Sequence, residues 1–244
     1  MGKKNIFLLF TIGIILLSTF FLIQPVSNPK KEISKFNLKV GDILFQDLDS
    51  SPLCDAIELV TPGYQNSNLS HIGIIIETGI FKIPNHYNEE HNPLLNTRVL
   101  EAIPGGVQST RLDSFLNQSL DDNGNPKVIV GRLKDNFSTA IPKAVKFCQE
   151  KIGFEYDDDF LLNNNKYYCS ELIYEAFEHD SIFSLSPMTF KDPYTKNTMH
   201  VWEKYYKKLN INIPENKLGV NPGSMSLSNK INIIHKYGKL SKKK

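Results

Sequence analysis

The chain has 244 residues, of which 41% are hydrophobic and 22% charged, and its formal net charge is +2. This length holds one sizeable domain or two small ones. Five lysines near the two ends carry the positive surplus, and removing them from +2 leaves −3: Lys3, Lys4, Lys242, Lys243 and Lys244. A body without a basic surplus lacks the charge pattern of nucleic-acid-binding proteins, so we expect no nucleic-acid partner.

The N-terminus begins with a lysine pair followed by an uncharged, mostly apolar run over residues 6–23. Its 18 residues are near the minimum for crossing a bilayer and exceed a usual signal-peptide core. Residues 24–27 match a cleavage site poorly, so an uncleaved anchor is favoured over a cleaved signal peptide. Positive charge before the run predicts that the remainder of the chain lies outside the membrane.

These features predict three segments. Residues 1–25 form a signal anchor or signal peptide, residues 26–38 a charged, proline-containing linker, and residues 39–240 one folded domain. We therefore expect a protein of the cell envelope whose domain lies on the outer face, or a secreted protein if the first segment is cut. The sequence does not predict its oligomeric state.

The sequence pattern in the first half of the domain predicts strands, one helix and a long polar loop. We expect strands at 43–45, 70–77, 99–103 and 107–110, a helix at 53–60, and the loop at 82–98. Within the second strand, His71 and Gly73 share a face, and the glycine leaves room for a neighbouring element. Glu101 is a carboxylate inside an apolar strand, so it is either an exposed edge residue or a buried group that needs a partner.

The second half predicts mainly helices. Their expected positions are 112–116, 140–151, 169 to about 179, and 199–209, with strands at 127–133 and 230–234. Trp202, Tyr205 and Tyr206 in the last helix are core residues or, alternatively, line a cleft.

The three cysteines are too few and too odd in number for a disulfide framework. Cys54 and Cys148 are interpreted as separate buried residues, with a pairing in an exported protein as the alternative. The chain has neither Cys-x-x-Cys nor His-Glu-x-x-His spacing. We therefore predict no local metal site and no cofactor.

Cys169 opens a predicted helix directly after a turn rich in asparagine at 163–165. The unpaired N–H groups and partial positive charge at a helix start stabilise a thiolate, which is the reactive form of cysteine. A small buried residue beginning a core helix is the alternative. Thiol catalysis also needs a base and a group that holds the base. His71 and Glu101 supply those residue types, and Glu101 would gain the partner that its strand position requires.

Four motifs in one order resemble the circularly permuted papain-like enzymes of the NlpC/YiiX type. They are Gly41-Asp42-Ile43-Leu44-Phe45, Ser70-His71-Ile72-Gly73-Ile74, Leu100-Glu101-Ala102 and Tyr168-Cys169-Ser170-Glu171-Leu172. The resemblance covers about residues 39–235. It implies an α+β papain-like fold, with a mainly antiparallel sheet packed on helices. It also implies a triad of Cys169, His71 and Glu101, and amide hydrolysis or acyl transfer through a thioester.

We accordingly expect a cysteine hydrolase that acts on a peptide or N-acyl amide. The backbone N–H of Cys169 is a natural donor to the oxyanion, and Tyr168 or Gln46 is a candidate for substrate binding as a second donor. Three alternatives stay open. The protein is a lipid acyl hydrolase or acyltransferase, or a catalytically silent binding module of the same fold, or it uses Cys169, His71 and Glu101 as zinc ligands.

Overall fold

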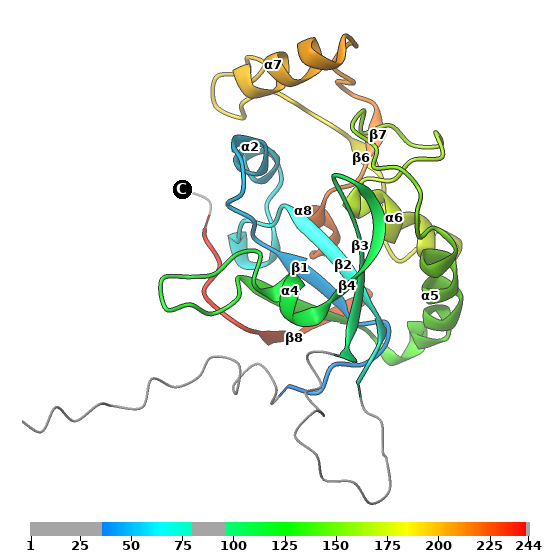
Figure 1. Ribbon diagram of the computed structural model, residues 1–244. Helices are drawn as coiled ribbons and strands as arrows, with labels where there is room; N and C mark the ends of the chain where they lie inside the picture. The colour runs from blue at the N-terminus through cyan, green and yellow to red at the C-terminus, as the bar shows by residue number, and fades with distance from the viewer. Residues whose placement is uncertain (1–35, 80–95, 243–244) are drawn as a thin grey trace, which may run out of the picture.

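The computed structural model describes residues 36–79 and 96–242, which form a six-stranded antiparallel sheet with helices on both faces (Figure 1). The strand order is β4-β3-β2-β1-β5-β8. The strands are β1 Ile43–Gln46, β2 His71–Glu77, β3 Arg98–Ile103, β4 Gly106–Arg111, β5 Val128–Leu133 and β8 Ile231–Lys236. The predicted anchor and linker up to residue 35, and most of the predicted loop at 82–98, lie outside the described residues.

The helices are α2 Pro52–Val60, α4 Leu112–Leu116, α5 Ile141–Glu150, α6 Cys169–Ala176, α7 His200–Leu209 and α8 Pro222–Met225. Short 3₁₀ turns cover Tyr64–Asn66, Asp135–Ala140 and Glu178–Asp180. Among the described residues, no helix combines the length and apolar character needed to span a membrane.

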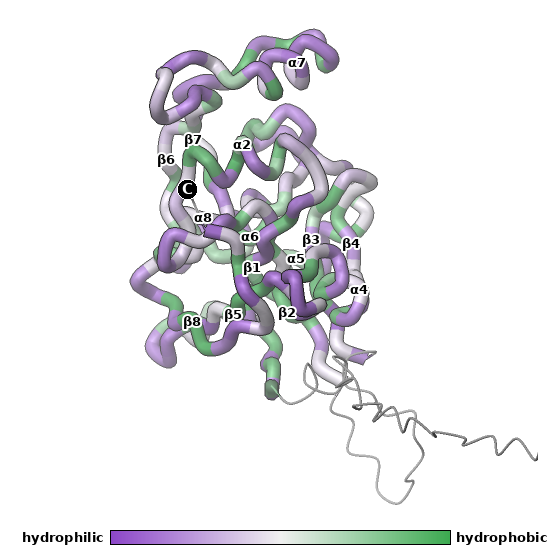
Figure 2. Tube along the Cα trace, turned by 90° about the vertical axis from the view of Figure 1, so that its left-hand side faces the viewer, coloured by the Kyte–Doolittle hydropathy of each residue, from purple (hydrophilic) through white to green (hydrophobic). Residues whose placement is uncertain are grey.

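The central strands β1, β2, β3 and β5 are mostly buried on both faces, which explains their nearly continuous apolar sequences. Strand β1 at its centre is fully buried, and Ile43 and Phe45 join the core on the side of α5 and α6. Leu44 joins the opposite core, which contains Phe115 of α4. In Figure 2 hydrophobic residues mark the central strands, whereas the outer helix α7 is largely hydrophilic.

Strand β3 pairs with both β2 and β4, so Glu101 is not an edge residue. Its side chain is completely buried. The predicted space beside Gly73 is filled, because a Cβ there would come within 2.6 Å of Val99 Cγ1 and 3.2 Å of Phe115 Cε2. Helix α4 therefore packs tightly against the face that carries Glu101.

Helix α6 begins at Cys169 as predicted but ends at Ala176, so the predicted end near residue 179 is wrong. The chain turns at Phe177, which caps the helix and is fully buried. The N–H of Ile182 then bonds back to the Phe177 carbonyl, and Ser181 adopts a left-handed conformation. Burial of Phe177 and Ile182 overrides the helical pattern of the residues between them.

Two segments missed by the sequence analysis complete the wall above the sheet. Strands β6 Ser186–Pro187 and β7 Leu218–Gly219 form a two-stranded sheet within regions predicted to be irregular. Nearby, Trp202 and Tyr206 of α7 pack in one cluster with Phe190 and with Ala56 of α2.

The C-terminal tail packs against the segment that follows β1. The backbone N–H of Ser241 donates to Asp47 Oδ2 at 2.6 Å, and Lys127 Nζ bonds Asp47 Oδ1 at 3.0 Å and Ser241 Oγ at 3.2 Å. Because Lys127 and Asp47 are buried, this ion pair fixes the segment that follows β1.

Candidate active site

His71 and Glu101 form a buried pair at one end of the sheet. His71 is the first residue of β2, and its Nε2 lies 2.6 Å from Oε2 of Glu101. The imidazole also packs against the Phe115 ring, with the two centroids 5.6 Å apart. The structure thus gives the carboxylate on β3 the partner that its burial requires.

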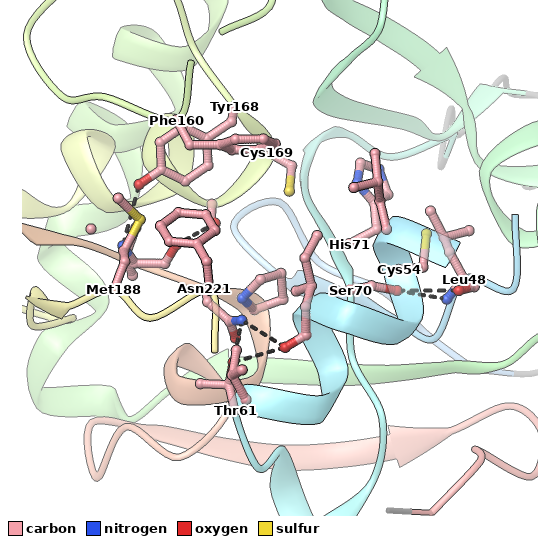
Figure 3. A pocket seen from close by; sticks show the side chains of 18 of the residues that line it. Leu48, Cys54, Thr61, Ser70, His71, Phe160, Tyr168, Cys169, Met188 and Asn221 are labelled. Carbon is pink, nitrogen blue, oxygen red and sulfur yellow. Dashed lines mark hydrogen bonds between the residues drawn. The ribbon is translucent and has the colours of Figure 1, made fainter. Parts of the chain in front are cut away.

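Cys169 joins this pair from the start of α6, which packs across β2 and β3. Figure 3 shows its Sγ directed toward the His71 ring. Burial alone would lower the pKa of His71, but hydrogen bonds with Cys169 and Glu101 outweigh it and raise that pKa to about 10. Since Glu101 occupies Nε2, Nδ1 is the nitrogen left for Cys169. The imidazole therefore stays protonated at neutral pH and presents a positive charge to the sulfur beside it.

The carboxyl group of Glu101 is held in its charged form. Burial acts to raise its pKa, but the hydrogen bond and positive charge of His71 prevail and lower it. Thr110 and Gln118 lower the pKa further. This carboxylate therefore orients the imidazole and stabilises its protonated state.

The two residues proposed as further substrate contacts differ in placement. Tyr168 lines the cavity described below, and its hydroxyl accepts a hydrogen bond from the Val220 N–H at 3.2 Å. Gln46 is fully buried, and its Nε2 donates to the Phe115 carbonyl at 2.9 Å. Because that bond turns its amide into the core beside α4, the expectation that Gln46 contacts substrate is wrong.

Cys169 and His71 open onto a cavity of about 410 Å³. Its walls come from α2, α7, the β6–β7 sheet and the loop before α6, and most of them are apolar (Figure 3). The apolar and aromatic lining residues include Leu53, Ile57, Phe160, Met188, Phe190, Trp202 and Tyr205. Of the three aromatic residues left open by the sequence, Trp202 and Tyr205 reach the cavity, whereas Tyr206 is a core residue.

The other two cysteines have different surroundings. Cys54 lines the same cavity, while Cys148 lies in the core, where burial raises its pKa to about 12. Both are free thiols, so the alternative of a disulfide between them is wrong. The sequence did not predict a place at the cavity for Cys54 or Ser70, or a hydrogen bond between Ser70 and Glu58, since each resembles an ordinary residue of an amphipathic helix or a strand end.

Comparison with known proteins shows the family of this chain. Residues 37–235 match the profile described as "Permuted papain-like amidase enzyme, YaeF/YiiX". The chain belongs to this family of amidases. No curated protein sequence gives a match.

Among solved structures, this chain resembles the metalloprotein yiiX from Escherichia coli O157:H7, with a TM-score of 0.61 and 20% sequence identity. The match covers 84% of this chain and 100% of that one. The similarity shows the shared α+β permuted papain-like fold with its mainly antiparallel sheet.

A metal site does not fit the residues of this family member that the structure describes. Within 36–79 and 96–242, no group of three histidine, cysteine, aspartate or glutamate side chains is placed to hold an ion. His71 Nε2 and Glu101 Oε2 touch directly at 2.6 Å, which leaves no space for zinc between them. The zinc alternative therefore has no support in this geometry.

A second buried carboxyl group belongs to Glu171, two residues after Cys169 in α6. Oε2 of Glu171 accepts the Tyr168 N–H at 3.3 Å, and its Oε1 is buried without a partner among the described residues. Burial, assisted by the negative charges of Asp157 and Glu175, raises the pKa of Glu171 to about 9. Glu171 is therefore a neutral acid that caps α6 at neutral pH.

We expect Glu171→Gln to stabilise the protein in a pH-dependent manner. An unfolded glutamate ionises near its ordinary pKa of 4.5, whereas the folded one stays protonated to about 9. Wild-type stability should therefore fall as pH rises through that window, and glutamine avoids this loss. We predict a gain of about 2 kcal/mol in the free energy of unfolding near pH 8 and almost none near pH 4.

Urea unfolding at the two pH values measures this effect. The exposed Glu150, changed to Gln, is the control and should alter stability by less than about 0.5 kcal/mol. An equal change for Glu171→Gln at both pH values would contradict a proton held by this side chain.

Proposed function

We propose that the protein is a thiol amidase whose nucleophile is Cys169. One observation carries the proposal: the His71 imidazole bonds Glu101 at 2.6 Å, and the Cys169 sulfur points toward the same ring at the opening of an apolar cavity (Figure 3). A base that is itself oriented by a third group is the arrangement that activates a nucleophile.

In the first step, Cys169 Sγ attacks the carbonyl carbon of the amide. The backbone N–H of Cys169, at the start of α6, donates to the oxyanion that forms. His71 then transfers its proton to the amide nitrogen, the C–N bond breaks, and the amine leaves a thioester on Cys169.

In the second step, water attacks the thioester carbonyl. His71 removes a proton from this water, and Glu101 stabilises the imidazolium that results. The C–S bond breaks, the acid leaves, and Cys169 returns to its thiolate beside protonated His71.

The walls of the cavity support an apolar acyl group as the part of the substrate bound next to Cys169. Side chains from α2, α7 and the loop at Phe160 offer aliphatic and aromatic surface for such a group. We therefore favour an N-acyl amide over a highly charged cell-wall peptide. The same surface is compatible with the lipid acyl alternative, in which the leaving group is an alcohol or the acceptor is not water.

Localisation follows only from the sequence. The apolar N-terminal segment supports a proposal that the domain acts on the outer face of the cell envelope, where amphipathic acyl amides are within reach.

Alkylation distinguishes the amidase from a silent binding module. Near pH 6, Cys169 should react with iodoacetamide at least about tenfold faster than free cysteine, because His71 stabilises its thiolate. Measurement in a Cys54→Ser background removes the other thiol that lines the cavity. His71→Ala in the same background should return the rate to that of an ordinary thiol. Slow labelling with His71 intact would favour the binding module.

A further inference from the structure

A polar pair that the proposed mechanism does not use lies in the same cavity wall. Ser70, directly before His71, lines the cavity, and its Oγ donates to Oε1 of Glu58 at 2.6 Å. Glu58 belongs to α2 and is only 3% exposed. The buried carboxyl group of Glu58 therefore influences the cavity through its hydrogen bond with the Ser70 hydroxyl.

The hydrogen bonds of Ser70 define what it can offer a ligand. A hydroxyl has one proton and two acceptor lone pairs. The proton goes to Glu58, because the carbonyl of Leu48 is the more distant acceptor at 3.4 Å. The N–H of Leu48 donates to one lone pair at 3.0 Å. One lone pair is left, so Ser70, which lines the cavity, has an acceptor rather than a donor free for a ligand.

The charges around Glu58 determine the pH range in which its carboxyl group is ionised and accepts the hydrogen bond from Ser70. Burial raises the pKa of Glu58 to about 7, the hydrogen bond from Ser70 opposes that rise, and Asp47, Asp49 and Asp55 add to it. Lys127 bonds both Asp47 and Asp49 and offsets part of their charge. Glu58 thus ionises near neutral pH, and the ionised form holds the Ser70 proton.

We propose that Ser70 accepts a hydrogen bond from the N–H of the scissile amide, and that Glu58 positions Ser70 for this contact. The inference rests on the proposed function and names the group that the site recognises. His71 protonates the leaving nitrogen, and both His71 and Ser70 line the cavity in which the amide would lie. An ester has no N–H to donate, so the pair selects amides over esters.

Two substrates with the same acyl chain test the proposal: an N-acyl 4-nitroanilide and the matching 4-nitrophenyl ester. Ser70→Ala should lower kcat/KM for the amide about tenfold more than for the ester. The control is Ser138→Ala, which removes a remote, exposed hydroxyl bonded to the Asp135 carbonyl and should leave the amide-to-ester ratio unchanged.

Glu58→Gln gives a second, independent readout. In the wild type the amide-to-ester ratio should rise with pH through about 7, as Glu58 becomes charged and holds the Ser70 proton. The variant should have a lower ratio and should lose that rise. If Ser70→Ala does not fold, the pH dependence of the amide-to-ester ratio in Glu58→Gln tests the proposal by itself.

Each outcome has a separate meaning. If both variants lower amide and ester turnover equally, Ser70 has no role toward the N–H and the inference is overturned while the amidase stands. If the wild type turns over neither substrate, the proposed function fails, and the inference fails with it.

Discussion

Cys169→Ala should lower kcat for an N-acyl amide by a factor of at least about 10⁴. The substitution removes the only atom that forms the thioester in the proposed mechanism. It removes little volume, so the fold and the apolar cavity should persist. Retained binding of the acyl amide, measured by calorimetry, together with lost turnover, would place the effect in the chemical step.

Cys54→Ser is the matched control, since Cys54 is the other thiol that lines the cavity. It should lose far less activity than Cys169→Ala, because no base among the described residues contacts Cys54; its sulfur meets the hydroxyls of Ser50 and Ser51. Full activity in Cys169→Ala on a substrate that the wild type hydrolyses would end the proposed mechanism.

His71→Ala should reduce kcat/KM by about 10³-fold or more, whereas Glu101→Gln should cost about 10- to 100-fold and change the pH profile. Protonated His71 delivers the proton to the leaving amine, so wild-type activity should persist into alkaline pH and fall as His71 loses its proton near 10. Glutamine removes the negative charge that helps to raise this pKa. The alkaline limb should therefore move to lower pH by about one unit or more.

Profiles of kcat/KM against pH for the wild type and Glu101→Gln measure this shift. The Thr110 side chain, which also acts on Glu101, gives a control in Thr110→Ser: this variant keeps the hydroxyl and should retain the wild-type limb. An unmoved alkaline limb in Glu101→Gln would show that Glu101 does not set the protonation of His71.

The sequence predicts most elements because their local patterns agree with their burial. The β-branched run from His71 to Glu77 forms β2, and the amphipathic pattern around Cys148 forms α5. The end of α6 is different, because burial of Phe177 depends on contacts distant in sequence. Strands β6 and β7 contain two residues each, which is too short for any periodicity to show.

A candidate site residue can be predicted from the sequence where its side chain does not fit the hydrophobic pattern of its neighbours. Glu101 in an apolar strand is such a residue, and its contact with His71 accounts for it. Gln46 shows the opposite case, since its end-of-strand position suggests the site while its amide turns to Phe115. The pairing of Ser70 with Glu58 was missed because a glutamate on an amphipathic helix usually faces solvent.

The three candidate site residues come from distant parts of the chain, because β2 and β3 precede α6 by a long stretch of sequence. No short fragment can therefore assemble the proposed site, and its formation requires the slow closure of long loops between them. In the proposed mechanism, a nascent or partly unfolded chain therefore carries an ordinary thiol at Cys169. The alkylation rate of this sulfur is consequently a reporter on complete folding, which can be followed through refolding from denaturant.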